Sequence, residues 1–253
     1  MIDLHCHILP VIDDGPRTME GSLRMATMAV EQGIHTVIAT PHHGTRGYSN
    51  KAITIRRRVQ QLNAELNRHS IPLTVLPGQE FHLTKAYDKE YRKGRLQTLA
   101  GSPYLLVELP SRTIPTFLNE FLSYMERQQR RVIIAHPERN ATVIQNPDLL
   151  FEWLKRDVLL QITTQSLVGY FGRSIQKTAF YLCENRLAHL IASDAHDPFR
   201  RSYYFQEAKA VVEQVGGVSL WQTFQTNAVD LLTNRDISAL PSFSSQSRKL
   251  EQN

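Results

Sequence analysis

Seven short β-rich runs recur along the chain, and segments with helical patterns separate most of them. Strands that alternate with helices build a parallel sheet, because each crossover must return the chain to the start of the next strand. The sequence therefore predicts an α/β fold with a parallel sheet. The predicted strands are residues 2–7, 36–42, 74–80, 104–109, 132–136, 158–163 and 189–194.

Two of the intervening segments carry clear helical signals. The first has Thr18 to cap its start and Gly33 to end it in a left-handed turn. The second, residues 117–129, repeats the apolar pattern of a crossover helix. Seven such units closed into a distorted (β/α)7 barrel account for 253 residues better than an open sheet does, although periodicity alone does not separate the two.

Histidines and carboxylates follow six of the predicted strands, and one more carboxylate lies in the loop after the first strand. A parallel barrel presents such residues at the carboxyl ends of its strands, where its active site lies. If these strand ends were only part of an apolar core, unpaired charged side chains would be excluded from them. The candidate metal ligands are His5, His7, Asp14, His42, Glu80, Glu108, His136, Asp194 and His196.

These nine ligands are too many for one tetrahedral ion, so two or three ions are implied. Mixed nitrogen and oxygen ligation suits zinc, manganese or iron better than a metal selected by thiolates. Four carboxylates against three divalent ions leave the site about two charges positive, which favours a phosphate dianion and a metal-bound hydroxide. Packing or exposure explains the other five histidines, which are His35, His43, His69, His82 and His189.

Composition places the chain among ordinary globular proteins. The hydrophobic content is 42%, which suits one domain over residues 1–237, followed by a polar, serine-rich tail over residues 238–253 that is predicted to be mobile. Only two cysteines occur, without a CxxC, and no secretory signal or apolar run of membrane-spanning length is present. We therefore expect a cytoplasmic protein that does not insert into membranes.

The motifs around the candidate ligands resemble a known family. In chain order they read IDLHCHILPVIDDGP, IATPHH, PGQE, VELP, IAHPERN, QITTQSLVG and IASDAH. Their order and spacing are similar to those of the PHP (polymerase and histidinol phosphatase) superfamily. Within it they resemble the bacterial tyrosine-protein phosphatases linked to capsule and exopolysaccharide synthesis. The resemblance covers roughly residues 1–235.

This resemblance implies a trinuclear centre, commonly occupied by Mn²⁺, with Fe or Zn as alternatives. By motif, the first ion takes His5, His7, Glu80 and Asp194, the second takes Glu80, Glu108 and His136, and the third takes Asp14, His42 and His196. The implied substrate is a phosphotyrosine protein, namely the tail of a bacterial tyrosine kinase that controls polysaccharide export.

The family also places two arginines on the substrate phosphate. By position these are Arg139, in the HPERN motif, and Arg201, a few residues beyond the DAH motif, with Arg200 as a rival. The intervening residues 197–199 depart from the subgroup pattern, as does Val11, where the subgroup has glycine.

Three other functions are weighed against this one. A cysteine-dependent phosphatase needs the pattern C-x5-R, but Ile12 and His189 stand where the arginine would follow Cys6 and Cys183, so that mechanism is excluded. A histidinol-phosphate or other small-molecule phosphatase keeps the same metal chemistry. The net charge of +5 also suits a nucleic-acid-directed phosphoesterase, yet no nucleic-acid-binding motif accompanies it, and we expect no nucleic-acid partner.

Overall fold

The computed structural model of the protein describes residues 1–45 and 47–237. Within these residues the strands form two sheets, and every strand pair is parallel. The first sheet has the order β1 (Ile2–Cys6), β2 (Thr36–Ala39) and β4 (Thr74–Pro77). The second has the order β3 (His42–His43), β5 (Glu80–His82), β6 (Tyr104–Glu108), β7 (Arg131–Ala135), β8 (Leu159–Thr163) and β9 (Leu190–Ala192).

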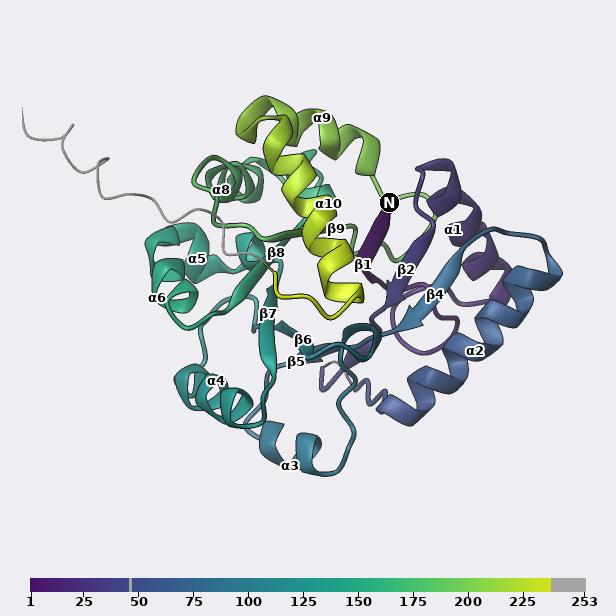
Figure 1. Ribbon diagram of the computed structural model, residues 1–253, viewed down its shortest axis with the longest axis horizontal. Coiled ribbons are helices and arrows are strands. Elements are labelled where there is room, and N and C mark those ends of the chain that lie inside the picture. The colour runs from purple at the N-terminus through teal and green to yellow at the C-terminus, as the bar shows by residue number, and fades with distance from the viewer. Residues whose placement is uncertain (46, 238–253) are drawn as a thin grey trace, which may run out of the picture.

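Helices surround the strands, and α10 passes across them (Figure 1). The longer helices are α1 (Met19–Glu31), α2 (Ala52–Arg68), α4 (Leu118–Arg127), α8 (Arg173–Glu184), α9 (Phe205–Gly216) and α10 (Val218–Leu232). The shorter ones are α3 (Tyr87–Arg92), α5 (Ala141–Gln145), α6 (Leu150–Leu154) and α7 (Thr164–Leu167), with 3-10 turns at Leu99–Gly101, Pro137–Arg139 and Pro147–Leu149. The α/β class and the parallel strand direction are thus confirmed.

Two of the seven predicted strands are interrupted. The run predicted at residues 36–42 forms β2 and β3, with Pro41 between them, and a proline cannot donate a backbone hydrogen bond to a ladder. The run at 74–80 forms β4 and β5, and at Gly78 between them a Cβ would lie 2.5 Å from Ile38 Cγ2. These breaks carry His42 and Glu80 out of the first sheet and into the second.

β1 also lies against the segment that follows β9, which joins the first sheet to the far edge of the second. The backbone N–H of Asp194 donates to the carbonyl of His5 at 2.8 Å, and that of His7 donates to the carbonyl of Ala195 at 2.8 Å. The register of β1 is irregular between Asp3 and Cys6. Because of these bonds, the ends of β1 and β9 present their side chains to one shared space.

An inner apolar cluster draws on strands of both sheets and is covered by α10. On β6, Leu106 belongs to this cluster, whereas Leu105 and Val107 face the outer cluster beneath the helices, as strand alternation requires. The inner cluster consists of Leu4, Ile38, Leu99, Tyr104, Leu106, Ile133, Ala135, Leu159, Leu190, Ala192, Ala228, Leu231 and Ile237. The polar candidate residues lie beyond it, towards the carboxyl ends of the strands.

The local helix signals behave as expected. Thr18 caps α1 through a hydrogen bond that its hydroxyl accepts from the backbone N–H of Gly21 at 3.1 Å, and Gly33 has a φ of +79°. The segment predicted at 117–129 forms α4. In the described part of the chain, no helix has the length and apolarity needed to cross a membrane. The tail predicted to be mobile, residues 238–253, lies outside the described residues.

Candidate metal centre

The first group of candidate ligands comes from β1, β5 and the end of β9. His5, His7, Glu80 and Asp194 are all buried. The Nε2 atoms of the two histidines lie 3.3 Å apart, and each lies 3.2–3.4 Å from Glu80 Oε2 and Asp194 Oδ1. Ligand bonds of about 2.1 Å in a tetrahedron separate neighbouring ligand atoms by about 3.4 Å. These four side chains therefore fit one metal ion.

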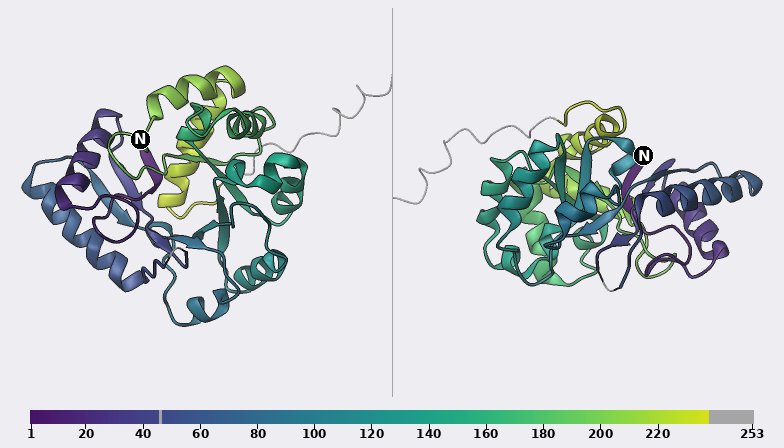
Figure 2. Two further views of the ribbon diagram at one scale, coloured as in Figure 1. Left: turned by 180° about the vertical axis from the view of Figure 1, so that it is seen from behind. Right: turned by 90° about the horizontal axis from the view of Figure 1, so that it is seen from below.

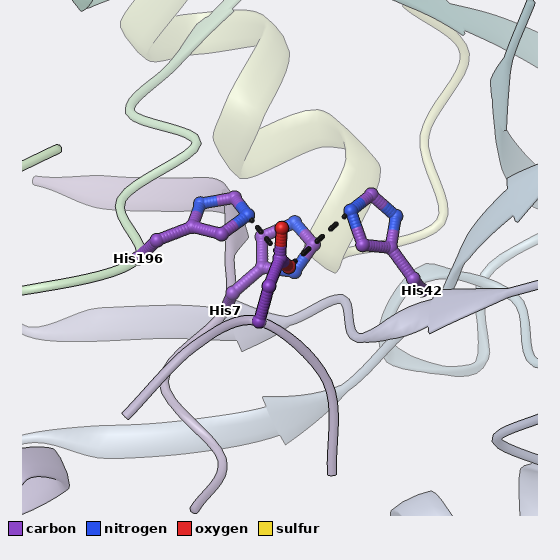
Figure 3. Close-up of side chains that lie close together, drawn as sticks. His7, His42 and His196 are labelled. Carbon is purple, nitrogen blue, oxygen red and sulfur yellow. Dashed lines mark ion pairs between the residues drawn. The ribbon is translucent and has the colours of Figure 1, made fainter. Parts of the chain in front are cut away.

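A second group collects around Asp14, in the loop after β1. Its carboxylate Oδ1 lies 3.5 Å from His42 Nε2 and 3.2 Å from His196 Nε2. Figure 3 shows the imidazoles of His7, His42 and His196 turned toward one another around this carboxylate, with the two ion pairs as dashed lines. His7 stacks on His196 with ring centroids 3.8 Å apart. The group also satisfies the distances expected for metal binding.

A third group comprises His42, Glu80 and Glu108. The family pattern groups Glu80 and Glu108 with His136, and His136 Nε2 does lie 2.7 Å from Glu80 Oε1, on the opposite side of the carboxylate from His42. Glu108 makes its own contact with His82, whose Nδ1 lies 2.8 Å from Glu108 Oε2. All nine predicted ligands therefore converge, with Glu80 central to two of the three groups.

The charges in this cluster keep its carboxylates ionised, while the same carboxylates outweigh burial and raise the pKa values of His5, His7 and His42, so that a bound cation would have to displace protons from these three histidines. Burial would raise the pKa of Glu80, but the charges of His5 and His42 outweigh it and hold that pKa well below its ordinary value. Burial lowers the pKa of His196 to about 4. Glu80 is therefore a carboxylate and His196 a neutral imidazole near pH 7, as metal ligands must be.

Three buried atoms of the cluster make close contacts with other ligand atoms but no well-aligned hydrogen bond among the described residues: His42 Nδ1 and Glu80 Oε2 lie 2.9 Å apart, and His196 Nε2 lies 3.2 Å from Asp14 Oδ1. Each can offer a lone pair, and the three lie in neighbouring ligand groups. Buried polar atoms without well-aligned hydrogen bonds are costly, and a divalent cation between them would satisfy their lone pairs. The donor set of nitrogen and oxygen atoms fits zinc, manganese or iron.

Two residues that the sequence reasoning missed orient the histidines. Asp13 Oδ2 accepts a hydrogen bond from His7 Nδ1 at 2.7 Å, and Gln161 Oε1 accepts one from His5 Nδ1 at 2.9 Å. Both contacts leave the histidine Nε2 lone pair free to face the first ligand group. The sequence contained a signal for each residue, because Asp13 adjoins the predicted ligand Asp14 and Gln161 is the first residue of the QITTQSLVG motif.

The two predicted phosphate-binding arginines meet at Asp194. Its Oδ2 accepts hydrogen bonds from Arg139 at 2.6 Å and from Arg201 at 2.9 Å, while its Oδ1 faces the histidines. Burial would raise the pKa of Asp194, but the charges of Arg139, His196, His5 and Arg201 together outweigh it and hold that pKa well below its ordinary value. Arg139 and Arg201 line one cavity of about 240 Å³, whereas Arg200 is exposed and does not line it. Five of the candidate ligands line the same cavity, namely His42, Glu80, Glu108, His136 and Asp194.

A buried network holds Arg139 in place. The hydroxyl of Thr163 accepts a hydrogen bond from Arg139 at 2.9 Å and donates one to the carboxylate of Glu138 at 3.0 Å. The guanidinium lies 4.1 Å from the centre of the Phe171 ring, within the range of a cation–π contact. Glu138, Thr163 and Phe171 were not singled out from the sequence, because nothing in its periodicity distinguishes them from core residues.

Cys6, the last residue of β1, is buried between His5 and His7. None of its side chain is exposed, its Sγ contacts the hydroxyl of Tyr203 and the carbonyl of Ala195 at 3.6 Å each, and burial raises its pKa well above the ordinary value. A thiol in this state is a poor nucleophile. His43, which adjoins His42, points away from the cluster and pairs with Glu90 at 3.1 Å.

Comparison with known proteins agrees with this geometry. The model of the family "Capsular polysaccharide synthesis, CpsB/CapC" matches residues 1–233. The tyrosine-protein phosphatase YwqE of Bacillus subtilis (strain 168) is 39% identical over 250 residues, which cover 99% of this chain and 98% of that protein. The tyrosine-protein phosphatase CpsB of Streptococcus agalactiae serotype III (strain NEM316) is 26% identical over 243 residues, which cover 94% of this chain and 100% of that protein.

Solved structures point the same way. One, from the work on YwqE of Bacillus subtilis and CpsB of Streptococcus pneumoniae, described as unique metal-dependent tyrosine phosphatases, superposes with a TM-score of 0.92 at 39% identity. The superposition covers 95% of this chain and 98% of the chain in the solved structure. The histidinol phosphate phosphatase of Lactococcus lactis superposes with a TM-score of 0.54 at 15% identity over 85% of this chain and 93% of that one, and shares the fold. The resemblance drawn from the motifs is confirmed.

Proposed function

The chain belongs to the capsular polysaccharide synthesis CpsB/CapC family, and from this premise we propose that it is a metal-dependent protein-tyrosine phosphatase. One observation carries the proposal: two arginines and a buried cluster of histidines and carboxylates line the same cavity. A cation cluster beside two guanidinium groups suits a phosphate dianion. When bound, divalent ions lower the pKa of water and neutralise phosphoryl charge.

The roles of the chain's own residues follow from their contacts. Arg139 and Arg201 bind the phosphoryl oxygens, and their shared contact with Asp194 places that phosphoryl group next to the first ligand group. Thr163 and Phe171 keep Arg139 in position. The buried ligand residues at the floor of the cavity lower the local dielectric constant, which strengthens each of these charge interactions.

We assign the nine predicted ligands to three Mn²⁺ ions in the grouping that the family implies. The distances within the first group and around Asp14 support two of these sites. The contacts of the two Glu80 oxygens with His136 and His42 support the third site, which Glu80, Glu108 and His136 would hold.

Phosphotyrosine is the proposed substrate because of its leaving group. A tyrosinate leaves with a pKa near 10, so it needs less help from a general acid than an alkoxide does. The family's link to capsular polysaccharide synthesis supports a bacterial tyrosine kinase of capsule or exopolysaccharide synthesis as the phosphoprotein. The net charge of +5 attracts an acidic segment of that partner.

The fold is proposed to be a distorted (β/α)7 barrel that forms one domain over residues 1–237. The hydrogen bonds between β1 and the segment after β9 support closure, as does the inner cluster that both sheets share. A reducing compartment, the cytoplasm, is consistent with the two free thiols of Cys6 and Cys183.

The test compares substrates on one preparation loaded with Mn²⁺. We expect kcat/KM to be highest for a phosphotyrosine peptide, lower for a phosphoserine peptide of the same sequence, and lower again for histidinol phosphate. A chelator should abolish turnover, and added Mn²⁺ should restore it. A tenfold preference for histidinol phosphate would refute the protein-phosphatase function while leaving the metal centre intact. Full activity in metal-stripped enzyme would refute the metal mechanism.

A further inference from the structure

Two exposed apolar side chains stand on loops that carry residues of the metal centre. Among the described residues, Phe199 at 72% and Val11 at 70% are the most exposed large hydrophobic side chains. Val11 lies three residues before Asp14, and Phe199 lies two residues before Arg201. Exposed apolar side chains are unremarkable singly, but a pair that flanks a site indicates a binding surface.

These two loops lie against each other. Asp14 Oδ1 is 3.2 Å from His196 Nε2, and Asp14 Oδ2 is 4.0 Å from a guanidinium nitrogen of Arg201. The guanidinium of Arg24, on α1, lies 5.7 Å from the centre of the Phe199 ring. In the right-hand view of Figure 2 the loop after β1 lies at the bottom of the molecule and α10 at the top.

The loop that carries Phe199 is an ordered turn. The carboxylate of Asp197 accepts hydrogen bonds from the backbone N–H groups of Phe199 at 2.8 Å, Arg200 at 2.7 Å and Arg201 at 3.1 Å. This Asx-type arrangement holds the backbone while the Phe199 side chain points into solvent. The exposed ring is thus presented by a defined turn.

Val11 is held in an unfavourable conformation. Its φ is +58°, a region that β-branched residues rarely adopt and that glycine adopts freely. Its backbone N–H donates to the carbonyl of Pro16 at 2.9 Å, so the turn itself is well formed. The side chain is too exposed for burial to offset this strain, so it contributes little to the stability of the isolated protein.

The surroundings of both side chains are positively charged. In residues 8–24 and 197–204, the exposed charged side chains are Arg17, Arg24, Arg200 and the single carboxylate Glu20. The carboxylate of Asp197 is already occupied by three backbone donors. We define the rim as the exposed side chains of Val11, Arg17, Arg24, Phe199 and Arg200.

We propose that this rim binds the polypeptide on either side of the phosphotyrosine, and that it selects segments with acidic and apolar residues there. The proposal rests on the proposed function. Phe199 and Arg200 immediately precede Arg201, which lines the cavity, so their exposed side chains lie close enough to contact a peptide whose phosphate reaches Arg201. The arginines complement acidic residues, and the two apolar side chains would be partly buried by an apolar neighbour of the phosphotyrosine.

The test uses three substrates: a phosphotyrosine peptide with glutamate and leucine flanks, the same peptide with glycine and serine flanks, and para-nitrophenyl phosphate. Wild-type enzyme should prefer the first peptide over the second. Phe199→Ser should lower kcat/KM for the first peptide about tenfold through KM, which is what partial burial of one aromatic side chain is worth. It should leave para-nitrophenyl phosphate within about twofold.

Val11→Gly and Val218→Ser complete the design. Val11→Gly removes the apolar side chain and relieves the positive φ, so we expect weaker peptide binding without a lower melting temperature. Val218 is 56% exposed, begins α10 and does not belong to the rim, so Val218→Ser should leave kcat/KM unchanged for all three substrates.

The inference is overturned if Phe199→Ser and Val11→Gly both hydrolyse the first peptide with the same kcat/KM as wild-type enzyme. It is also overturned if both variants lower kcat/KM for para-nitrophenyl phosphate as much as for the first peptide, because the two loops would then only maintain the geometry of the active site. If Phe199→Ser and Val11→Gly bind acidic lipid vesicles more weakly than wild type but keep its kcat/KM for the first peptide, the rim binds a membrane surface instead. If wild-type enzyme hydrolyses no phosphotyrosine substrate at all, the proposed function fails and the rim proposal falls with it.

Discussion

Replacing Asp13 with asparagine tests whether a residue outside the ligand set controls metal binding. Asp13 Oδ2 accepts hydrogen bonds from His7 Nδ1 at 2.7 Å and from the backbone N–H of His42 at 3.1 Å, and Oδ1 accepts one from the backbone N–H of Gly15 at 3.0 Å. Burial would lower the pKa of His7, but Asp13, together with Asp194 and Glu80, outweighs it and raises that pKa well above the ordinary value. The contact also leaves His7 Nε2 as the atom that faces the first ligand group.

Asparagine has nearly the same shape but only one acceptor atom. Whichever way its amide turns in Asp13→Asn, the NH₂ group faces a backbone N–H, of His42 or of Gly15, and one buried donor loses its acceptor. Such a loss destabilises the fold by about 1–3 kcal/mol. Removing a carboxylate that orients a metal-binding histidine lowers metal affinity about 10–100-fold, or about 1.4–2.7 kcal/mol.

The assay titrates Mn²⁺ into metal-stripped enzyme and follows both binding heat and phosphatase activity. We expect the half-saturating Mn²⁺ concentration of Asp13→Asn to rise 10–100-fold, with activity recovered at excess metal. Asp88→Asn is the matched control, because Asp88 pairs with Arg92 at 2.6 Å on the surface of α3. If Asp13→Asn and Asp88→Asn bind Mn²⁺ as tightly as wild type does, Asp13 does not orient His7.

Alanine at Arg139 or Arg201 should lower kcat by about 10²–10³-fold with unchanged metal content, because each removes a donor to the phosphoryl group; a larger loss for Arg200→Ala, measured in the same assay, would show that the loop register is wrong. Cys6→Ser should retain turnover, since the thiol is buried; a hundredfold loss would restore a role for it. Burial lowers the pKa of His189 from 6.5 to about 4, so in this pH range the unfolded chain binds a proton that the folded protein does not. Neutral His189 therefore contributes fully to the free energy of unfolding above pH 6.5, and this contribution falls by about 3 kcal/mol as the pH drops towards 4. In urea unfolding of the metal-free protein, His189→Asn should lose less stability than wild type between pH 6.5 and pH 4. Equal losses in the two proteins would contradict this.

The sequence by itself determined the class of fold and the members of the candidate site. Apolar runs that end in a histidine or carboxylate predict both a buried strand and the polar position at its carboxyl end. Because side chains alternate along a strand, the same pattern places His5 with His7 and turns His43 away from His42. These are local properties, set by each residue and its close neighbours in the chain.

The motifs favoured Asp14 and Arg201, but only the tertiary structure decided what each residue of the two adjacent pairs contacts. Asp13 and Asp14 are chemically identical, but the turn after β1 directs Asp13 to His7 and Asp14 to His196. Arg201 reaches the cavity instead of Arg200 because its side chain pairs with Asp194.

Long-range contacts also decided where the strands break and what holds the site. Gly78 is required because Ile38, forty residues earlier, leaves no room for a Cβ, and this break carries Glu80 into the second sheet. Thr163 and Phe171 reach Arg139 only after β7 and β8 have paired. Such contacts join residues distant in the chain, so their partners are set by packing and leave no periodic signal in the sequence.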